Sequence, residues 1–227
     1  MALDALIFDI DGTLIDTNAY HVEAWQKAFA SLGHQVPAER IAVEIGKGGD
    51  LLVPSILGQE ANREQGEALR KAHADEFGKI AEKNRFKVFP GVVPLFAELH
   101  KRGISTALAT SSSKKHLDAI AKSARLDLEA LADVLITADD AQTSKPFPDL
   151  VLAALHKLRL TARQCAMVGD TPYDAEACRR AGVVCLGVLS GGNSEETLRA
   201  AGAKAVWKDA ADLLAHLDQA LAIAMQP

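Results

Sequence analysis

Two aspartates that follow an apolar run near the N-terminus have the residue type and the spacing of a cation site. Residues 5–14 read Ala-Leu-Ile-Phe-Asp-Ile-Asp-Gly-Thr-Leu, so one isoleucine separates Asp9 from Asp11. The uninterrupted apolar start predicts a strand buried inside a parallel sheet. Because side chains alternate along a strand, we expect both carboxylates to project to the same side. Two carboxylates in one small volume repel each other unless a divalent cation such as Mg²⁺, which prefers oxygen ligands, lies between them.

Three more polar clusters follow predicted strands, where open α/β sheets place their chemistry. Thr110 and Ser111 stand at the start of a predicted helix, whose free N–H groups bind anions. Lys145 precedes a proline that stiffens the neighbouring backbone. Asp170 and Asp174 lie one helical turn apart at the start of another predicted helix. Taken singly, each cluster also fits a plain structural role, namely a serine cap, an exposed loop lysine or an aspartate N-cap, and the first Asp-Gly pair also fits a simple turn.

In this order, the four clusters resemble the four signatures of the haloacid dehalogenase superfamily, whose members mostly transfer phosphoryl groups through an aspartyl-phosphate. The matching strings are Phe-Asp-Ile-Asp-Gly-Thr-Leu, Ala-Thr-Ser, Ser-Lys-Pro-Phe-Pro-Asp and Gly-Asp-Thr-Pro-Tyr-Asp. The resemblance covers residues 1–16 and 85–192 well, and residues 17–84 more loosely.

The resemblance implies a role for each of these residues. Asp9 is the implied nucleophile, and Asp11 is the implied acid that protonates the leaving oxygen and then the base that activates water. Thr110, Ser111 and Lys145 are implied to bind the phosphoryl group, with Thr110 and Lys145 in the catalytic set. The implied ligands of a Mg²⁺ cofactor are Asp9, Asp11, Asp170 and Asp174. Dehalogenases of the superfamily lack the second aspartate, so Asp11 argues against carbon–halogen chemistry.

Strand and helix patterns that alternate from residue 85 onward predict an α/β fold with a doubly wound, right-handed parallel sheet. Besides the first strand, the expected strands are 88–91, 104–110, 134–137, 164–168, 183–189 and an edge strand at 204–207. One amphipathic helix is expected at 210–224. We therefore assign residues 1–16 and 85–227 to a Rossmann-like catalytic core.

The segment between residues 17 and 85 contains no predicted strand and so interrupts this alternation. Helical spacing of apolar residues is found instead at 16–33, 38–45, 51–57 and 60–83, and Asp16 or Thr17 is expected to cap the first helix. Residues 17–84 are therefore expected to form an inserted helical domain. This insert resembles the small α-helical cap that family members carry, which closes over the site and reads the leaving group.

Four side chains of the insert are candidates for contact with the substrate: Thr17, His21, Lys47 and Lys71. The start of the insert resembles that of β-phosphoglucomutase and its sugar-phosphatase relatives, in which a histidine like His21 helps to hold the acid–base aspartate. His21 equally fits the surface of an amphipathic helix, and residues 46–49 fit either a plain linker or a specificity loop. Lys71 matches a phosphate-binding lysine of the mutase only across a one-residue gap. The remaining histidines are expected at the surface or in packing: His34, His73, His100, His116, His156 and His216.

The composition argues against several classes of function. The chain has 227 residues, 48% of them hydrophobic, and a formal net charge of −5 with scattered basic residues, so no nucleic-acid or anionic membrane surface is expected. Its three cysteines lack the spacing of a disulfide framework or a metal site and are expected to be reduced core residues. Without a secretory signal or a membrane-spanning run, the expected location is the cytoplasm, and the expected assembly is a monomer or weak homodimer.

Together these features predict a Mg²⁺-dependent phosphatase that hydrolyses a small phosphorylated metabolite through an aspartyl-phosphate. Phosphoglycolate, hexose phosphates and polyol phosphates all stay open as substrates. The alternative is a phosphosugar mutase of the β-phosphoglucomutase type, which needs a second phosphate site in the cap, with Arg40, Lys47 and Lys71 as its candidates. A third hypothesis is a non-catalytic binding protein, although none of the core residues named above is missing.

Overall fold

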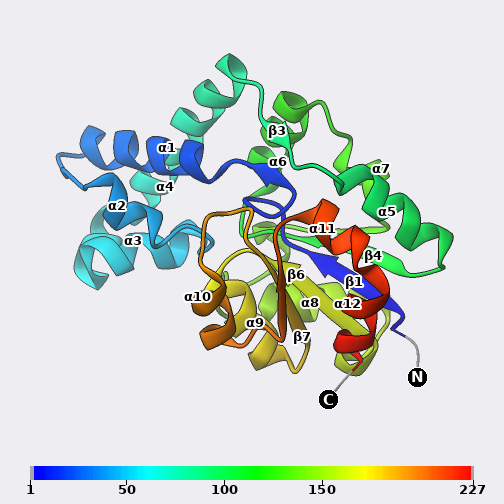
Figure 1. Cartoon of the computed structure of the whole chain (residues 1–227). Helices are drawn as coiled ribbons and strands as arrows, with labels where there is room; N and C mark the ends of the chain where they lie inside the picture. Colours follow the sequence, from blue (N-terminus) through cyan, green and yellow to red (C-terminus); the bar gives the residue numbers. More distant parts are fainter. Residues whose placement is uncertain (1–2, 226–227) are drawn as a thin grey trace.

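The main sheet consists of six parallel strands in the computed structural model, which describes residues 3–225. The strand order is β5-β4-β1-β6-β7-β8, so the first strand of the chain lies in the interior of the sheet (Figure 1). The strands are β1 (Ala5–Phe8), β4 (Ser105–Ala109), β5 (Val134–Ile136), β6 (Cys165–Gly169), β7 (Val184–Val188) and β8 (Ala205–Trp207). Ala5 of β1 pairs with Ser105 of β4 on one side and with Cys165 of β6 on the other. The predicted α/β fold with a doubly wound parallel sheet is confirmed.

Alternate side chains of β1 pack against opposite faces of the sheet. Leu6 and Phe8 belong to a buried cluster whose helices from the core are α5 (Val92–Lys101), α6 (Lys114–Ala124), α7 (Leu128–Leu131), α11 (Ala210–Ala215) and α12 (Leu217–Ala224). Ala5 and Ile7 belong to a second cluster with α8 (Asp149–Leu158) and α9 (Pro172–Ala181). The other core elements are α10 (Glu195–Ala201) beside α9, and two 3₁₀ turns, η1 (Ala138–Asp140) and η2 (Ala162–Gln164). Because helices cover both faces, β1 is apolar at every position.

Four helices form the insert, which lies to one side of the main sheet (Figure 1). They are α1 (Asn18–Ser31), α2 (Ala38–Ala42), α3 (Gly49–Leu57) and α4 (Gln59–Lys83). The insert has its own buried apolar cluster: Trp25, Ala28, Phe29, Ile41, Leu52, Val53 and Leu69. The helices of the insert therefore pack mainly on one another, while Ala24 of α1 and the end of α4, with Phe77, Ile80 and Ala81, join the cluster that contains Leu6 and Phe8.

A two-stranded antiparallel ribbon connects the insert to the core. It pairs β2 (Ile15–Asp16) with β3 (Lys87–Val88), where the chain leaves the core and where it returns. The prediction that residues 88–91 form a strand of the alternating sheet is therefore wrong. At this point the two ends of the insert lie side by side, so their backbone groups pair with each other rather than with the main sheet.

The helix expected at 210–224 is interrupted at His216, which has the non-helical angles φ −115° and ψ 26°. Its ring nitrogen Nδ1 lies 2.9 Å from the carbonyl oxygen of Asp212, which also accepts a hydrogen bond from the His216 backbone N–H. The side chain thus competes for the last carbonyl groups of α11, and the chain restarts as α12. Among the described residues, no helix combines the length and the apolar character that crossing a membrane requires.

Candidate active site

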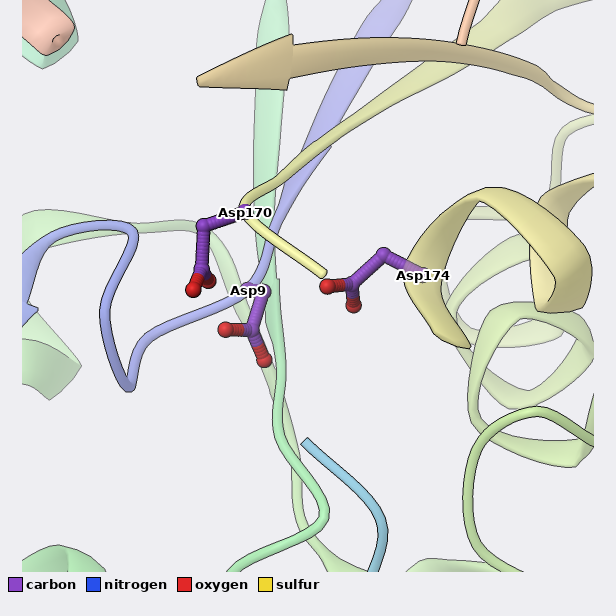
Figure 2. A group of neighbouring side chains, drawn as sticks. All are labelled: Asp9, Asp170 and Asp174. Carbon is purple, nitrogen blue, oxygen red and sulfur yellow. The ribbon is translucent and has the colours of Figure 1, made fainter. Parts of the chain in front are cut away.

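Three buried aspartates meet at the carboxyl edge of the sheet. Asp9 follows β1, Asp170 follows β6, and Asp174 lies in the first turn of α9 (Figure 2). One carboxylate oxygen of each lies within 4.8 Å of the others. The buried ammonium group of Lys145 forms ion pairs with Asp9 and, at 2.8 Å, with Asp174. Residues from three distant parts of the chain thus form one cluster of charge.

This cluster has more negative than positive charge. Burial raises the pKa of Asp9 well above its usual value; Lys145 opposes this increase, while Asp174 and Asp170 add to it. Burial and the neighbouring Asp174 raise the pKa of Asp170 to about 7. Burial alone would lower the pKa of Lys145, but Asp174 and Asp9 raise it above its usual value. One ammonium therefore does not neutralise three carboxylates, and an added divalent cation would.

Asn18 and Thr13 fix the carboxylate of Asp170. Thr13 Oγ1 donates to Asp170 Oδ1 at 2.7 Å, and Asn18 Nδ2 donates to Asp170 Oδ2 at 3.2 Å and to the carbonyl of Gly191 at 3.1 Å. Because the Gly191 carbonyl can only accept, Nδ2 must face this side. Asn18 Oδ1 is then left buried without a hydrogen-bond partner among the described residues. The carboxylate oxygens of the aspartate cluster are the ligands that a hydrated Mg²⁺ ion prefers, so the residues present fit this ion.

The carboxylate of Asp11 is not part of this cluster. It accepts hydrogen bonds from Thr17 Oγ1 at 2.6 Å, Ser112 Oγ at 3.0 Å and Thr110 Oγ1 at 3.2 Å, and its Oδ1 lies 3.1 Å from His21 Nε2. Burial would raise the pKa of Asp11, but His21 and the hydrogen bonds outweigh burial and lower it.

Asp9 and Asp11 line one cavity, as expected, but the expectation that strand alternation directs both carboxylates is wrong, because β1 ends at Phe8. Asp11 instead pairs with Ile15 in an isolated bridge, and Gly12 turns the chain with a φ of +81°. The prediction of a side-chain cap on α1 is also wrong, since Thr17 makes no cap hydrogen bond and uses its hydroxyl group for Asp11.

The serine and threonine cluster after β4 links the core to the insert. Thr110 Oγ1 accepts a hydrogen bond from the backbone N–H of Ser112 at 3.0 Å, and Ser111 Oγ donates to the carbonyl of Gly46 at 3.2 Å. Ser113 caps α6 by accepting from the backbone N–H of His116. The implied contacts of Thr110 and Ser111 with a phosphoryl group stay predictions.

A cavity of about 340 Å³ lies between the core and the insert. Its core wall includes Asp9, Asp11, Thr110, Ser111, Ser112, Ser113, His116 and Ser144, and its insert wall includes His21, Trp25, residues 45–50, Arg70, His73 and Ala74. Both proposed catalytic aspartates therefore face a space that the two parts of the chain enclose together.

The basic residues of the insert differ in their relation to this cavity. Lys47 lines it, but its ammonium group is paired with Glu44 and donates to Ser55 Oγ at 3.0 Å. Lys71 is exposed and is not part of the cavity wall, whereas Arg70 lines it. Arg40 is exposed and donates to the Ser55 carbonyl at 3.0 Å. The cation that α4 contributes to the cavity wall is therefore Arg70 and not Lys71.

Sequence reasoning missed Asn18, Arg70, His73 and His116. His73 packs on Trp25, as expected, with ring centroids 4.1 Å apart, but it also lines the cavity, and so does His116. Arg70, His73 and Phe77 recur at helical spacing, and the burial of Phe77 shows that this face of α4 points inward. That periodicity was the available signal for Arg70 and His73. The sequence carried no comparable signal for Asn18.

Comparison with known proteins agrees with this geometry. Residues 3–182 match the model of the haloacid dehalogenase-like hydrolases. The provisionally named pyrophosphatase PpaX of Caldanaerobacter subterraneus is 32% identical over 185 residues, which is 81% of this chain and 80% of that protein. The phosphoglycolate phosphatase of Yersinia pestis is 30% identical over 217 residues, which is 94% of this chain and 92% of that protein.

Solved structures include a hydrolase from Pseudomonas syringae with 34% sequence identity and a TM-score of 0.87, covering 95% of this chain and 98% of that chain. The family match spans most of the chain, and the structural match extends over both the core and the helical insert. The chain therefore belongs to the haloacid dehalogenase-like hydrolases, among the phosphatase-type members that carry a helical insert.

Proposed function

We propose that this protein is a Mg²⁺-dependent phosphatase that hydrolyses a small phosphorylated metabolite through an aspartyl-phosphate on Asp9. The observation that carries this proposal is the position of Asp9: it is buried, ion-paired with Lys145, next to Asp170, and on the wall of the cavity between the core and the insert. In the same proposal, residues 17–84 act as the cap over a core of residues 1–16 and 85–227, and Asp9, Asp170 and Asp174 hold Mg²⁺, directly or through water.

Electrostatic repulsion between Asp9 and the substrate phosphate has to be overcome in the first step, in which the aspartyl-phosphate forms. A carboxylate that attacks a phosphate dianion is repelled by it, so positioning and screening supply most of the catalysis. Lys145 screens Asp9, and a bound divalent cation adds the positive charge that the three carboxylates lack. An oxygen of Asp9 forms a bond to phosphorus while the bond from phosphorus to the leaving oxygen breaks, and Asp11 gives that oxygen a proton.

Asp11 has a second task in hydrolysis of the aspartyl-phosphate. It removes a proton from the water that releases phosphate, which regenerates the Asp9 carboxylate and protonated Asp11. The contacts with His21 and Thr17 that lower the pKa of Asp11 favour the carboxylate form needed for this step. A phosphate dianion beside Asp11 would raise its pKa again, which favours the protonated form for the first step.

The cavity favours a leaving group with its own negative charge. The guanidinium group of Arg70 donates to the neutral amide of Asn62 at 3.0 Å, and no carboxylate among the described residues pairs with it. The named substrates of the relatives, phosphoglycolate and pyrophosphate, each carry a second anionic group beside the transferred phosphoryl group. We infer that the substrate is of this kind, with its second anionic group near Arg70.

The mutase alternative has less support. It needs a second phosphate site, but Arg40 and Lys71 lie outside the cavity wall, and Lys47 is already paired with Glu44. Among the described residues that line the cavity, Arg70 is the cation without a carboxylate partner, which suits one anionic substituent of a leaving group.

The test is phosphate release from a panel of phosphoesters, with and without Mg²⁺: phosphoglycolate, pyrophosphate, hexose phosphates, polyol phosphates and 4-nitrophenyl phosphate. We expect Mg²⁺-dependent release that is highest for an anionic leaving group, and no release by the Asp9→Asn variant. Loss of β-glucose 1-phosphate without free phosphate would favour the mutase. A silent panel with retained Mg²⁺ binding would favour a binding protein, and full activity of Asp9→Asn would exclude Asp9 as the nucleophile.

A further inference from the structure

Three histidines from three helices meet behind Asp11. His21 comes from α1 and His73 from α4 in the insert, whereas His116 comes from α6 in the core. The ring centroids of His21 and His73 are 5.5 Å apart, and those of His73 and His116 are 5.1 Å apart. Since Asp11 also belongs to the core, this group of rings spans the boundary between the two parts of the chain.

The rings of His21 and His73 are held by flat stacking. His21 stacks on Phe77 at a centroid distance of 4.1 Å and an interplanar angle of 8°. His73 stacks on Trp25 at 4.1 Å and 10°. Both histidines are buried, with 7% and 5% of their surface exposed. The planes of both rings are therefore fixed. The nitrogen atoms that carry protons follow from their hydrogen-bond partners.

The contact with Asp11 decides the protonation of His21 Nε2. Its Nε2 lies 3.1 Å from Asp11 Oδ1, and an ionised carboxylate can only accept, so Nε2 carries a proton. Its Nδ1 lies 3.4 Å from His73 Nε2. When His21 is neutral, Nδ1 carries no proton and His73 Nε2 is the donor; when His21 is protonated, its Nδ1–H group donates to His73 Nε2 instead. Among the described residues, no other hydrogen-bond partner of His21 Nδ1 is present.

His73 is suited to this task because burial lowers its pKa well below the usual value. His73 is therefore neutral and has a single N–H group. His116 meets the ring of His73 edge-on at 83°, and its Nε2 has no hydrogen-bond partner among the described residues. Neither neighbour introduces a positive charge beside His21.

We propose that His73 is a positioning residue, which holds the imidazole of His21 through Nδ1 so that the Nε2–H group of His21 stays directed at Asp11. The chain of contacts runs from His73 in α4 through His21 in α1 to Asp11 in the core. Without His73, Nδ1 of His21 loses its partner and the other tautomer becomes accessible. That tautomer would place the bare Nε2 against the carboxylate, where two lone pairs repel, and Asp11 would no longer be held for proton transfer.

This inference rests on the proposed function, in which Asp11 transfers protons. It predicts an effect on the chemical step and little effect on binding of the phosphoryl group, because His73 does not contact the Asp9 and Lys145 cluster. The effect should also be larger for substrates whose leaving oxygen needs a proton than for an activated aryl phosphate.

The experiment compares His73→Phe, which keeps an aromatic ring against Trp25 but removes the donor, with His73→Gln, whose amide N–H stands near the former Nε2. For the best alkyl phosphate of the panel, we expect His73→Phe to lower kcat by about 10- to 100-fold and to change KM by less than about 3-fold. His73→Gln should recover most of kcat. The exposed His156→Phe serves as the matched control and should behave as the wild type.

A second readout does not depend on turnover. In a ¹H–¹⁵N spectrum of the imidazole groups, wild-type protein should show a protected Nε2 proton on His21, as should His73→Gln, whereas His73→Phe should lose it to exchange with water. Wild-type kcat together with a protected Nε2 proton in His73→Phe would overturn the proposal. A wild-type protein that is inactive on the whole panel would instead refute the proposed function, and the spectrum alone would then decide the role of His73.

Discussion

The side-chain amide of Asn18 donates a hydrogen bond to Oδ2 of Asp170 at 3.2 Å. Asn18 is the first residue of α1, so this bond joins the insert to a carboxylate of the proposed Mg²⁺ site. The space around it is full: a Cβ atom on Gly12 would lie 2.3 Å from Asn18 Nδ2 and 2.4 Å from Asp170 Oδ2. The position of α1 and the orientation of the carboxylate are therefore linked.

Replacement of Asn18 by alanine should weaken Mg²⁺ binding. It removes the donor that orients Asp170, and the loss of such a supporting group commonly costs about 10- to 100-fold in metal affinity. Titration calorimetry at neutral pH measures the Mg²⁺ affinity of the variant and of the wild type. Asn193→Ala is the comparison, because Asn193 donates to the backbone carbonyl of Asp170 and not to its carboxylate. Equal losses in the two variants would contradict a role of the Asn18 side chain at the carboxylate.

Replacement of Lys145 by methionine should destabilise the metal-free protein strongly. It leaves buried Asp9 and Asp174 without their ammonium partner, which typically costs about 3–5 kcal/mol in free energy of unfolding. Added Mg²⁺ should restore part of this loss, because it supplies positive charge to the same carboxylates. Urea unfolding at pH 8 with and without Mg²⁺ tests both points. Lys157→Met, which breaks the half-exposed pair with Asp140, should cost less than about 1 kcal/mol.

Arg70 and its neighbour Lys71 should differ in their effect on substrate binding. For a substrate with an anionic leaving group, Arg70→Gln should raise KM by about 10- to 100-fold, since a hydrogen bond to a charged group is worth roughly 1.5–3 kcal/mol. The KM for 4-nitrophenyl phosphate should stay nearly constant. Lys71→Gln should change neither, because Lys71 is exposed outside the cavity wall. A larger effect of Lys71→Gln than of Arg70→Gln would instead show that Lys71, the lysine indicated by the sequence, binds the anionic group.

The stability of the protein should fall as the pH is lowered from about 6.5 towards 4, in part because of His116. Burial, with a contribution from His21, lowers the pKa of His116 from 6.5 to about 4. Between these values the unfolded chain binds more protons at this residue than the folded chain, so acid favours unfolding, by up to about 3 kcal/mol at pH 4. Denaturant unfolding at a series of pH values should therefore give a flatter dependence for His116→Gln than for the wild type. Parallel curves would show that His116 titrates normally in the folded protein.

The core of the site could be predicted from the sequence alone. Asp9, Lys145, Asp170 and Asp174 lie in segments that follow parallel strands or start the helices after them, and the carboxyl ends of parallel strands share one edge of a sheet. The strand pattern therefore predicted that these residues meet, and Lys145, Asp9 and Asp174 are in direct contact. The helical insert could also be predicted from the sequence, because an amphipathic segment without any strand cannot continue a βα alternation.

The directions of individual side chains could not be predicted, because they depend on how the helices and loops pack. Successive residues of a helix point about 100° apart, so an alignment uncertain by one residue could not distinguish Arg70 from Lys71 at the cavity. Asp11 lies beyond the end of β1, where the pleat no longer sets its direction, and the hydroxyl groups of Thr17 and Ser112 orient it instead. Contacts such as that between His73 and His21 depend on how α4 packs on α1, and periodicity along one helix contains no information about the rotation of its neighbour.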